Sequence, residues 1–239
     1  MTVTWEEAGW ERLAAGVGRC RLPGWDCTVG LVIGGDSALL IDAGSSLAEG
    51  ARLRGQAQAL AGRRVTHLAL THAHFDHVFG AAVFAGATVL VAGGLSELFE
   101  HGGEELRADA VRNGLDPRAA ENAADLLVCP SEYVWGPTVL ELDGGPEVRL
   151  VAMRGHTAHD LVVVVPGDPP VVFCGDLVEE SGEPQAGPDA VPGLWPAALD
   201  RLLSLGGEDA LYVPGHGAVV DAGFVRAQRD ALATRFGVS

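Results

Sequence analysis

The sequence of 239 residues contains no lysine, because all 16 of its basic residues are arginine. Enzymes that form a Schiff base, nucleotide-binding P-loops and Ser–Lys dyads all need a lysine, so these mechanisms are excluded. The basic residues are outnumbered by 32 acidic ones, which gives a formal net charge of -16 at pH 7. Since nucleic acids and anionic membranes bind positive surfaces, we expect neither as a partner.

Long apolar runs and a secretory leader are also missing. No stretch approaches the ~20 apolar residues that span a bilayer. The N-terminus, Met1-Thr2-Val3-Thr4-Trp5-Glu6-Glu7, is acidic and lacks the basic head and apolar stretch of a signal peptide. No Cys-x-x-Cys pair occurs among Cys20, Cys27, Cys129 and Cys174, which we expect to be buried as small hydrophobic residues. These features predict a cytoplasmic protein.

The chain does contain a series of short β-branched runs that alternate with helical stretches. Its length and its 48% of hydrophobic residues suit a globular α/β protein, and we predict one domain over residues 1–239. Strands are predicted at 28–33, 38–41, 65–70, 87–91, 138–142, 147–152, 161–165, 171–174 and 211–213. Helices are predicted at 46–61, in parts of 94–127, at 196–205 and at 222–235.

Two stretches interrupt this alternation and are candidates for a substrate pocket. Residues 93–137 are predicted to be a mostly helical insertion, and residues 179–195 form a Gly/Pro-rich loop that is too long for a simple connector. Tyr133, Trp135 and Trp195 lie in these stretches and are predicted to line the pocket. The alternative for each of them is ordinary packing in the core.

The motif Thr71-His72-Ala73-His74-Phe75-Asp76-His77 directly follows the predicted strand 65–70. In an extended segment, alternate side chains point to the same side, so His72, His74 and Asp76 are predicted to converge. His77 would join them where the backbone curls. Imidazole and carboxylate ligands together suit zinc, and also iron or manganese. The absence of a neighbouring thiolate in the sequence argues against a closed structural zinc site. The motif therefore predicts a metal site with an open position.

Three further candidates repeat one local pattern, in which a strand is followed by a glycine and then by a possible metal ligand. They are His156 after Gly155, Asp176 after Gly175, and His216 after Gly215. Glycine lets the backbone turn sharply and approach a metal closely. The repetition indicates that these side chains complete the site begun by the first motif.

With these motifs the chain resembles the metallo-β-lactamase superfamily, over about residues 20–220. The resemblance rests on His72-x-His74-x-Asp76-His77, Gly155-His156-Thr157, Gly175-Asp176, Pro214-Gly215-His216-Gly217 and Leu40-Ile41-Asp42-Ala43-Gly44. It implies a four-layer αββα sandwich, in which two mixed β-sheets pack face to face with helices outside and metals at one edge.

The resemblance also implies how seven ligands share two divalent ions, zinc in the first place, with iron or manganese as alternatives. The first ion would be held by His72, His74 and His156, the second by Asp76, His77 and His216, and Asp176 would bridge them. Asp42 would orient a ligand without binding metal itself. A turn-forming role is the alternative for Asp42, and structural roles are favoured for His159.

Two such ions ~3.5–4 Å apart can share a water and lower its pKa toward ~7, which supplies a bridging hydroxide for attack on a carbonyl or phosphoryl group. Asp76 is the predicted catalytic residue, because it can orient this hydroxide and pass its proton to the leaving group. The sequence thus predicts a dinuclear hydrolase whose partner is a small-molecule substrate, and it carries no signal for an oligomeric state.

The substrate class follows partly by elimination. The missing lysine and the short chain after His216 disfavour the glutathione conjugates of glyoxalase II relatives, which bind through basic residues. The commonest β-lactamases of the family carry cysteine where this chain has Asp176, so β-lactam hydrolysis is disfavoured, and phosphodiester hydrolysis ranks equally low. A small ester, thioester or lactone is the remaining prediction. The alternatives are a mononuclear iron enzyme like the persulfide dioxygenases, and a non-catalytic binding module.

Overall fold

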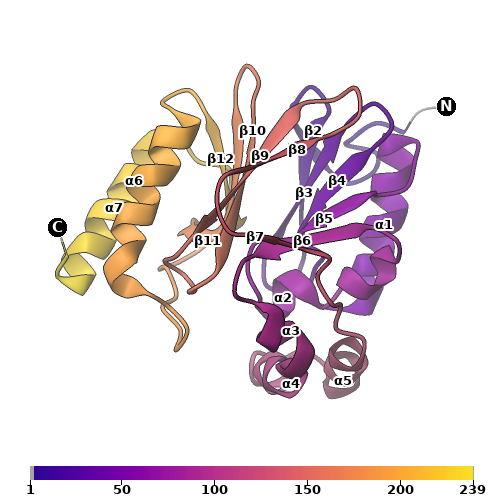
Figure 1. Cartoon of the computed structure of the whole chain (residues 1–239), viewed down its shortest axis with the longest axis horizontal. Helices are drawn as coiled ribbons and strands as arrows, with labels where there is room; N and C mark the ends of the chain where they lie inside the picture. The colour runs from indigo at the N-terminus through magenta and orange to yellow at the C-terminus, as the bar shows by residue number, and fades with distance from the viewer. Residues whose placement is uncertain (1–2, 239) are drawn as a thin grey trace.

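Two β-sheets lie face to face at the centre of the molecule, and helices cover their outer faces (Figure 1). The computed structural model that shows this arrangement describes residues 3–238. In spatial order, the first sheet contains β1 (Glu11–Ala14), β2 (Val17–Arg21), β3 (Thr28–Ile33), β4 (Ala38–Ile41), β5 (His67–Ala69), β6 (Thr88–Ala92) and β7 (Glu132–Val134). The second contains β12 (Leu211–His216), β11 (Val171–Glu179), β10 (Asp160–Val165), β9 (Glu147–Met153) and β8 (Thr138–Glu141).

Both sheets are mixed. In the first sheet β1 to β4 pair antiparallel, and β4 to β7 pair parallel. In the second sheet β8 to β11 pair antiparallel, and β11 pairs parallel with β12. The predicted ligands of the second sheet lie toward the carboxyl ends of β11 and β12, and the first motif follows the carboxyl end of β5. This polarity gathers the ligands at one edge of the sandwich.

The interface between the sheets is apolar and closely packed. Leu40 of β4 and Leu150 of β9 are both fully buried in this core, which draws on both sheets. Phe173 of β11 also packs there, and a Cβ placed on Gly30 of β3 would lie 2.4 Å from its ring. Glycine at position 30 is therefore what lets the two sheets approach each other around Phe173.

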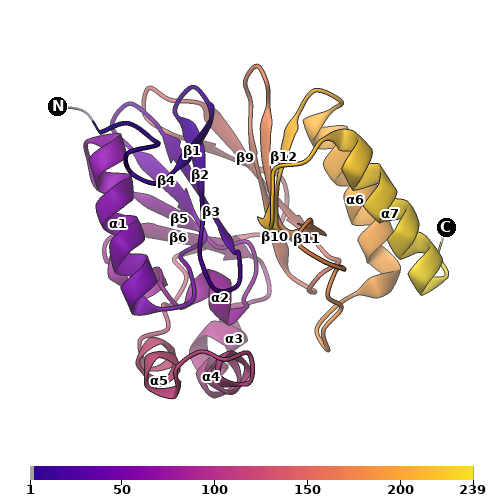
Figure 2. The same cartoon turned by 180° about the vertical axis from the view of Figure 1, so that it is seen from behind.

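Helix α1 (Leu47–Ala61) covers the outer face of the first sheet, and α6 (Trp195–Gly206) and α7 (Ala222–Phe236) cover the second (Figure 2). The N-terminus of α1 is capped by Ser46, whose hydroxyl accepts a hydrogen bond from the backbone N–H of Glu49. A second core, which includes Trp195 and Tyr212, fills the space between the second sheet and its helices. The four predicted layers, αββα, are confirmed.

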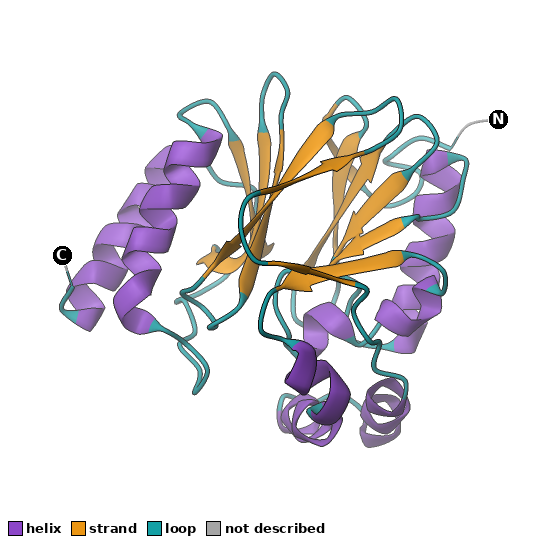
Figure 3. Cartoon of the chain, viewed as in Figure 1, coloured by secondary structure: helices purple, strands orange, loops and turns teal. Residues whose placement is uncertain are grey.

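The predicted strands and helices are found close to their expected positions, but the structure adds elements that were not predicted. These are β1, β2, β7, the short helix α2 (Phe75–Val78) and two 3-10 turns, η1 (Ala81–Phe84) and η2 (Pro192–Leu194). The predicted insertion 93–137 contains α3 (Ser96–His101), α4 (Gly103–Arg112) and α5 (Pro117–Asp125), which lie together beyond the sheet edge (Figure 3). It also contains β7, so part of it belongs to the first sheet. Among the described residues, no helix is both long and apolar enough to cross a membrane.

Candidate metal centre

The first motif changes from extended to helical backbone at His74, which precedes α2 and keeps extended angles of φ -96° and ψ 151°. His72 and His74 therefore lie on the extended part, and Asp76 and His77 lie on the helix. The prediction that Asp76 shares a side with His72 and His74 is wrong for this reason. Asp76 and His77 point instead toward His216, because one helical turn carries them to the neighbouring group of side chains.

The second sheet supplies the other three side chains. His156 lies in the turn between β9 and β10, as predicted. Asp176 and His216 lie inside β11 and β12, where the pairing of the two strands shifts register, and not after the strands as predicted. Gly215 is needed here, because a Cβ at this position would lie 1.8 Å from Oδ1 of Asp176.

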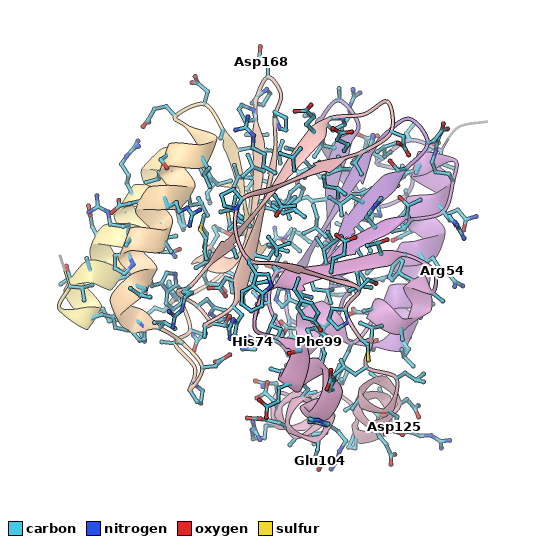
Figure 4. All side chains as sticks on the ribbon, in the orientation of Figure 1. Arg54, His74, Phe99, Glu104, Asp125 and Asp168 are labelled. Atoms are coloured by element: carbon cyan, nitrogen blue, oxygen red, sulfur yellow. The ribbon has the colours of Figure 1, made fainter. Side chains whose placement is uncertain are left out.

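All seven predicted ligands come together, in two groups that share Asp176. In the first group, Nδ1 of His74 lies 3.1 Å from Nε2 of His72 and 3.1 Å from Nε2 of His156. In the second group, Nε2 of His77 lies 3.4 Å from Nε2 of His216, and Oδ2 of Asp76 lies 3.3 Å from the same His216 atom. The oxygens of Asp176 lie within 3.3–3.6 Å of nitrogens in both groups. Figure 4 labels His74 where the two halves of the sandwich meet.

Each of the five imidazole rings turns its other nitrogen outward to an oxygen. The pairs are His72 Nδ1 with Thr71 Oγ1 (3.1 Å), His74 Nε2 with Asp189 Oδ2 (3.0 Å), His77 Nδ1 with Asp42 Oδ2 (2.8 Å), His156 Nδ1 with Gln185 O (3.0 Å) and His216 Nδ1 with Trp25 O (2.7 Å). Four of these oxygens are carbonyl or carboxylate oxygens, which only accept hydrogen bonds, and the Thr71 hydroxyl donates its proton to Asp42. The rings therefore donate outward and keep their lone pairs for the inside. Five inward lone pairs and two carboxylates form a site for cations.

Asp42 organises two of these rings. Its Oδ1 accepts a hydrogen bond from the backbone N–H of Thr71 (2.7 Å), and its Oδ2 accepts from the Thr71 hydroxyl (2.8 Å) and from His77. The Thr71 hydroxyl, having donated to Asp42, accepts from His72 in turn. Asp42 has a φ of 63°, an unusual backbone conformation for a residue other than glycine. The structure thus places Asp42 behind two predicted ligands, where a residue that orients ligands is expected.

The electrostatics of the centre also fit bound cations. Burial alone would raise the pKa of Asp176, but the surrounding imidazoles hold it well below its usual range. Burial lowers the pKa of His156 to about 4. Burial would also lower the pKa of His216, but Asp176 and Asp76 raise it to about 9. Oδ1 of Asp176 is buried and has no hydrogen-bond donor among the described residues. An anionic oxygen without a donor, facing imidazole nitrogens, matches the donor set of a borderline divalent ion such as zinc.

A pocket of about 380 Å³ opens beside these groups. Besides predicted ligands, it is lined by Trp25 and Phe75, by Asp109 of α4 and Asn113 that follows this helix, and by residues of the stretch 179–187. Residues of the loop 179–195 and, through Asp109, of the insertion 93–137 therefore line this pocket.

The predicted aromatic lining of this pocket is wrong. Trp195 is the first residue of α6 and is completely buried, and its Nε1 donates to the carbonyl of Leu177 (2.9 Å). Trp135 is 78% exposed and its ring lies over Gly93, away from the pocket. Tyr133 lies in β7 and packs against the main core. These aromatic residues were expected to face the substrate because they lie in the stretches 93–137 and 179–195. Their orientation is instead set by the face of each helix or strand that packs against the sheets.

Besides the partners of the histidines, Trp25 and Cys27 near the centre were not predicted from the sequence. Trp25 accepts the hydrogen bond from His216 and also lines the pocket. Cys27 is buried, with its Sγ 3.6 Å from Nδ1 of His77 and its thiol donating to the carbonyl of Asp76 (3.3 Å). Burial raises the pKa of Cys27 to about 12. Its Sγ, Asp76 and His77 also form a group that could hold a metal ion. Neither residue carries a local signal, since both approach the centre only through the tertiary fold.

The remaining predicted positions are consistent with structural roles. Cys20 and Cys174 are buried, as predicted, whereas Cys129 is exposed because it follows α5 at the surface of the insertion. His159 packs over Gly94, and its backbone N–H donates to the hydroxyl of Thr157 (3.0 Å). The turn that carries His156 is held by Asp160, which accepts from the backbone and hydroxyl of Thr157.

Comparison with known proteins gives a consistent picture. A family model described as "Metallo-beta-lactamase superfamily" matches residues 22–216. Over 155 residues the chain is 30% identical to "Metallo-beta-lactamase domain-containing protein 1" of Xenopus laevis, which covers 64% of this chain and 54% of that protein. Over 155 residues it is 26% identical to "Hydroxyacylglutathione hydrolase" of Nitrosococcus oceani, which covers 65% of this chain and 49% of that protein. The chain thus spans about half the length of these curated relatives.

Solved structures share the fold across almost the whole chain. The metallo-beta-lactamase FIM-1 from Pseudomonas aeruginosa, in its mono-zinc form, has a TM-score of 0.70 at 19% identity and covers 96% of both chains. A metallo-beta-lactamase from Pontibacter korlensis has a TM-score of 0.67 at 21% identity, over 93% of this chain and 97% of that one. At these identities the likeness establishes the arrangement of the sheets and helices.

Proposed function

Since the chain belongs to the metallo-beta-lactamase superfamily, we propose that it is a metal-dependent hydrolase that binds two divalent ions and cleaves a small ester, thioester or lactone. The observation that carries this proposal is the set of five imidazoles whose outer nitrogens are all bonded to oxygens and whose inner nitrogens converge with two carboxylates. Ligands of this kind suit zinc first, and iron or manganese as alternatives.

The first ion would be held by His72, His74 and His156, and the second by Asp76, His77 and His216, with Asp176 shared between them. When bound, two such ions supply the Lewis acidity that activates water and polarises a carbonyl group. The protein contributes rigid ligand orientation, through hydrogen bonds that are made before substrate arrives.

Asp76 is the proposed proton carrier. Its Oδ2 faces His216, and its carboxylate also lines the substrate pocket. A carboxylate held at the pocket floor can accept a proton from the attacking water and deliver it to the leaving group. Neither a serine nor a cysteine nucleophile is needed, and the Cys27 side chain is buried.

The pocket walls support a small substrate without a large anionic tail. Apart from the predicted ligands, the charged side chains that line the pocket are Asp109, Glu179 and Glu183, and no arginine lines it among the described residues. A glutathione conjugate or a phosphodiester would meet carboxylates of the same sign there. Trp25 and Phe75 instead offer an aromatic wall, with ring centroids 5.3 Å apart, against which an acyl group can pack.

A substrate panel on metal-loaded protein tests the proposal. We expect two ions per chain by mass spectrometry, and turnover of uncharged thioesters or lactones above that of a phosphodiester, a cephalosporin or a glutathione thioester. Turnover should be lost when the metal is chelated and should return when zinc is added. Saturation at one iron ion, together with oxygen-dependent turnover of a persulfide, would replace the hydrolase by the dioxygenase alternative.

A further inference from the structure

His74 is held by a residue of the loop 179–195, and unlike the other four histidines of the centre it turns Nε2 outward. Its Nδ1 points inward to the first group, and its Nε2 points outward to Oδ2 of Asp189 at 3.0 Å. The two residues are 115 positions apart in sequence. The Asp189 side chain is 48% exposed, so this contact lies at the open side of the centre, where solvent can reach it.

The same loop holds a second histidine of the first group. The carbonyl of Gln185 accepts a hydrogen bond from Nδ1 of His156 at 3.0 Å. Close by, the backbone N–H of Val191 donates to the carbonyl of Gly155 at 2.9 Å, which fixes the loop against the turn that carries His156. Two of the three histidines of the first group thus depend on this loop for their orientation.

The second group is held by other parts of the chain. His77 donates to Asp42 and His216 donates to the carbonyl of Trp25, and both acceptors lie far from the loop in sequence. The third histidine of the first group, His72, is held by the neighbouring Thr71. The rings of the two proposed ion sites therefore have separate outer acceptors, and the loop supplies acceptors only to rings of the first group. The loop meets the second group through the backbone, where the N–H of Glu180 donates to the carbonyl of His216 (3.1 Å).

We propose that Asp189 is a positioning residue for His74, and that through it the loop 179–195 forms the outer support of the first metal site. The proposal rests on the metal centre of the proposed function. A carboxylate that accepts the outer N–H of a ligating histidine fixes the ring and its tautomer and makes the inner nitrogen a stronger ligand. Occupancy of the first site and order of the loop then stabilise each other.

This linkage also reaches the substrate pocket, because Gly182, Glu183 and Gln185 of the loop line it. An ion in the first site would hold His74 in place, His74 would hold Asp189, and the loop would form a defined pocket wall. Without Asp189, the wall and the first site should loosen together while the second site keeps its ligands.

The test compares Asp189→Ala and Asp189→Asn with the matched pair Asp209→Ala and Asp209→Asn. Asp209 is exposed and lies before β12, at the opposite end of that strand from His216. The probe is Zn²⁺ alone, titrated into chelator-treated protein in competition with a fluorescent indicator. We expect Asp189→Ala to lower the zinc affinity of one of the two sites by roughly 10–100-fold, the range found when metal ligands lose their outer hydrogen-bond partners. Asp189→Asn should lie in between, and both Asp209 variants should match the wild type.

Hydrogen exchange of the loop gives a second readout that does not depend on turnover. Zinc should slow exchange across residues 179–195 in the wild type and in the Asp209 variants, but not in Asp189→Ala. Unchanged zinc affinity and zinc-dependent protection in a folded Asp189→Ala protein would overturn the proposal. If the wild type binds a single ion, the proposal of a two-ion hydrolase is refuted. The role of Asp189 is still tested in that case, because its variants either lower the affinity for that ion or leave it unchanged.

Discussion

The carbonyl oxygen of Trp25 lies 2.7 Å from Nδ1 of His216, across 191 positions of the sequence. The same tryptophan donates from Nε1 to the carbonyl of Asn113 at the end of α4 (3.3 Å), and its ring meets Phe75 edge-on. One residue thus supports a proposed metal ligand through its backbone and forms a pocket wall through its side chain. These two roles can be separated, because a substitution removes only the second.

Replacing Trp25 by alanine should change substrate selectivity and leave metal content intact. The backbone carbonyl remains to accept from His216, whereas the aromatic wall is lost. We expect discrimination between a large and a small acyl group to fall by ~1–3 kcal/mol, as for other pocket contacts. The measurement is kcat/KM on two esters of different acyl size. Trp135→Ala is the matched control, because Trp135 is 78% exposed outside the pocket, and an equal effect there would refute the assignment.

Gly215→Ala should abolish metal binding. The added methyl group would lie 1.8 Å from Oδ1 of Asp176, so the shared carboxylate must move out of both groups. We expect zinc content to fall from two ions toward none while the far-ultraviolet circular dichroism stays near that of the wild type. Gly193→Ala is the control, since a Cβ there meets open space. Full zinc content in Gly215→Ala would show that Asp176 is not a shared ligand.

Asp42→Asn and Thr71→Val should separate the two ion sites. Asp42 accepts directly from His77 of the second group, and asparagine would turn an N–H toward that donor in place of an acceptor. We expect roughly 10–100-fold weaker binding at the second site. Thr71→Val keeps Asp42 but removes the acceptor of His72, so the first site should weaken instead. Calorimetric titration with zinc resolves the two steps, and identical losses at one site in both variants would contradict this division.

The stability of chelator-treated protein should fall as the pH rises from 6.5 to 9, because the raised pKa values of Asp160, about 8, and of His216, about 9, both lie in that range. The pKa of His156 falls to about 4 in the folded protein from an ordinary value of 6.5, so its contribution is complete above 6.5 and is lost as the pH falls toward 4. The pKa of His216 rises from 6.5 to about 9, so its contribution is complete below 6.5 and is lost as the pH rises through 9. Urea unfolding at pH 5, 6.5 and 9 measures both effects.

Zinc-loaded protein is the comparison for that experiment. Metal binding needs the neutral form of both histidines, so zinc should reduce the loss of stability between pH 6.5 and 9 and steepen the loss in acid. A metal-free protein whose stability keeps rising from pH 6.5 to 9 would contradict the raised pKa of His216.

The side chains that converge in the candidate metal centre could be selected from the sequence because each is polar, lies close to a buried strand and has a local mark. His156, Asp176 and His216 each follow a glycine, and the first motif follows β5 directly. The helix at Phe75 was missed, so Asp76 was assigned to the wrong side, although the family resemblance placed it with His77 and His216. A short helix has too few residues to show the periodicity on which such predictions depend.

The partners of the ligands could not be predicted in the same way. The acceptors of His156 and His216 are backbone carbonyls, which any residue at positions 185 and 25 would supply. Asp189 is one of many acidic residues in the chain, and only the folded loop brings it to His74. The error with Trp195 has the same origin, since a large aromatic residue beside a loop is equally suited to a pocket or to the face of α6 that packs on the second sheet.

The proposed ligands belong to both sheets, so ions bound among them would fasten one half of the sandwich to the other. Residues 72–77 follow a strand of the first sheet, whereas residues 156, 176 and 216 belong to the second. A protein fastened in this way opens less often, and proteases act on the opened chain. The supply of the bound metal would then affect how long each copy of the protein survives, and the amount of protein would follow that supply even at constant synthesis.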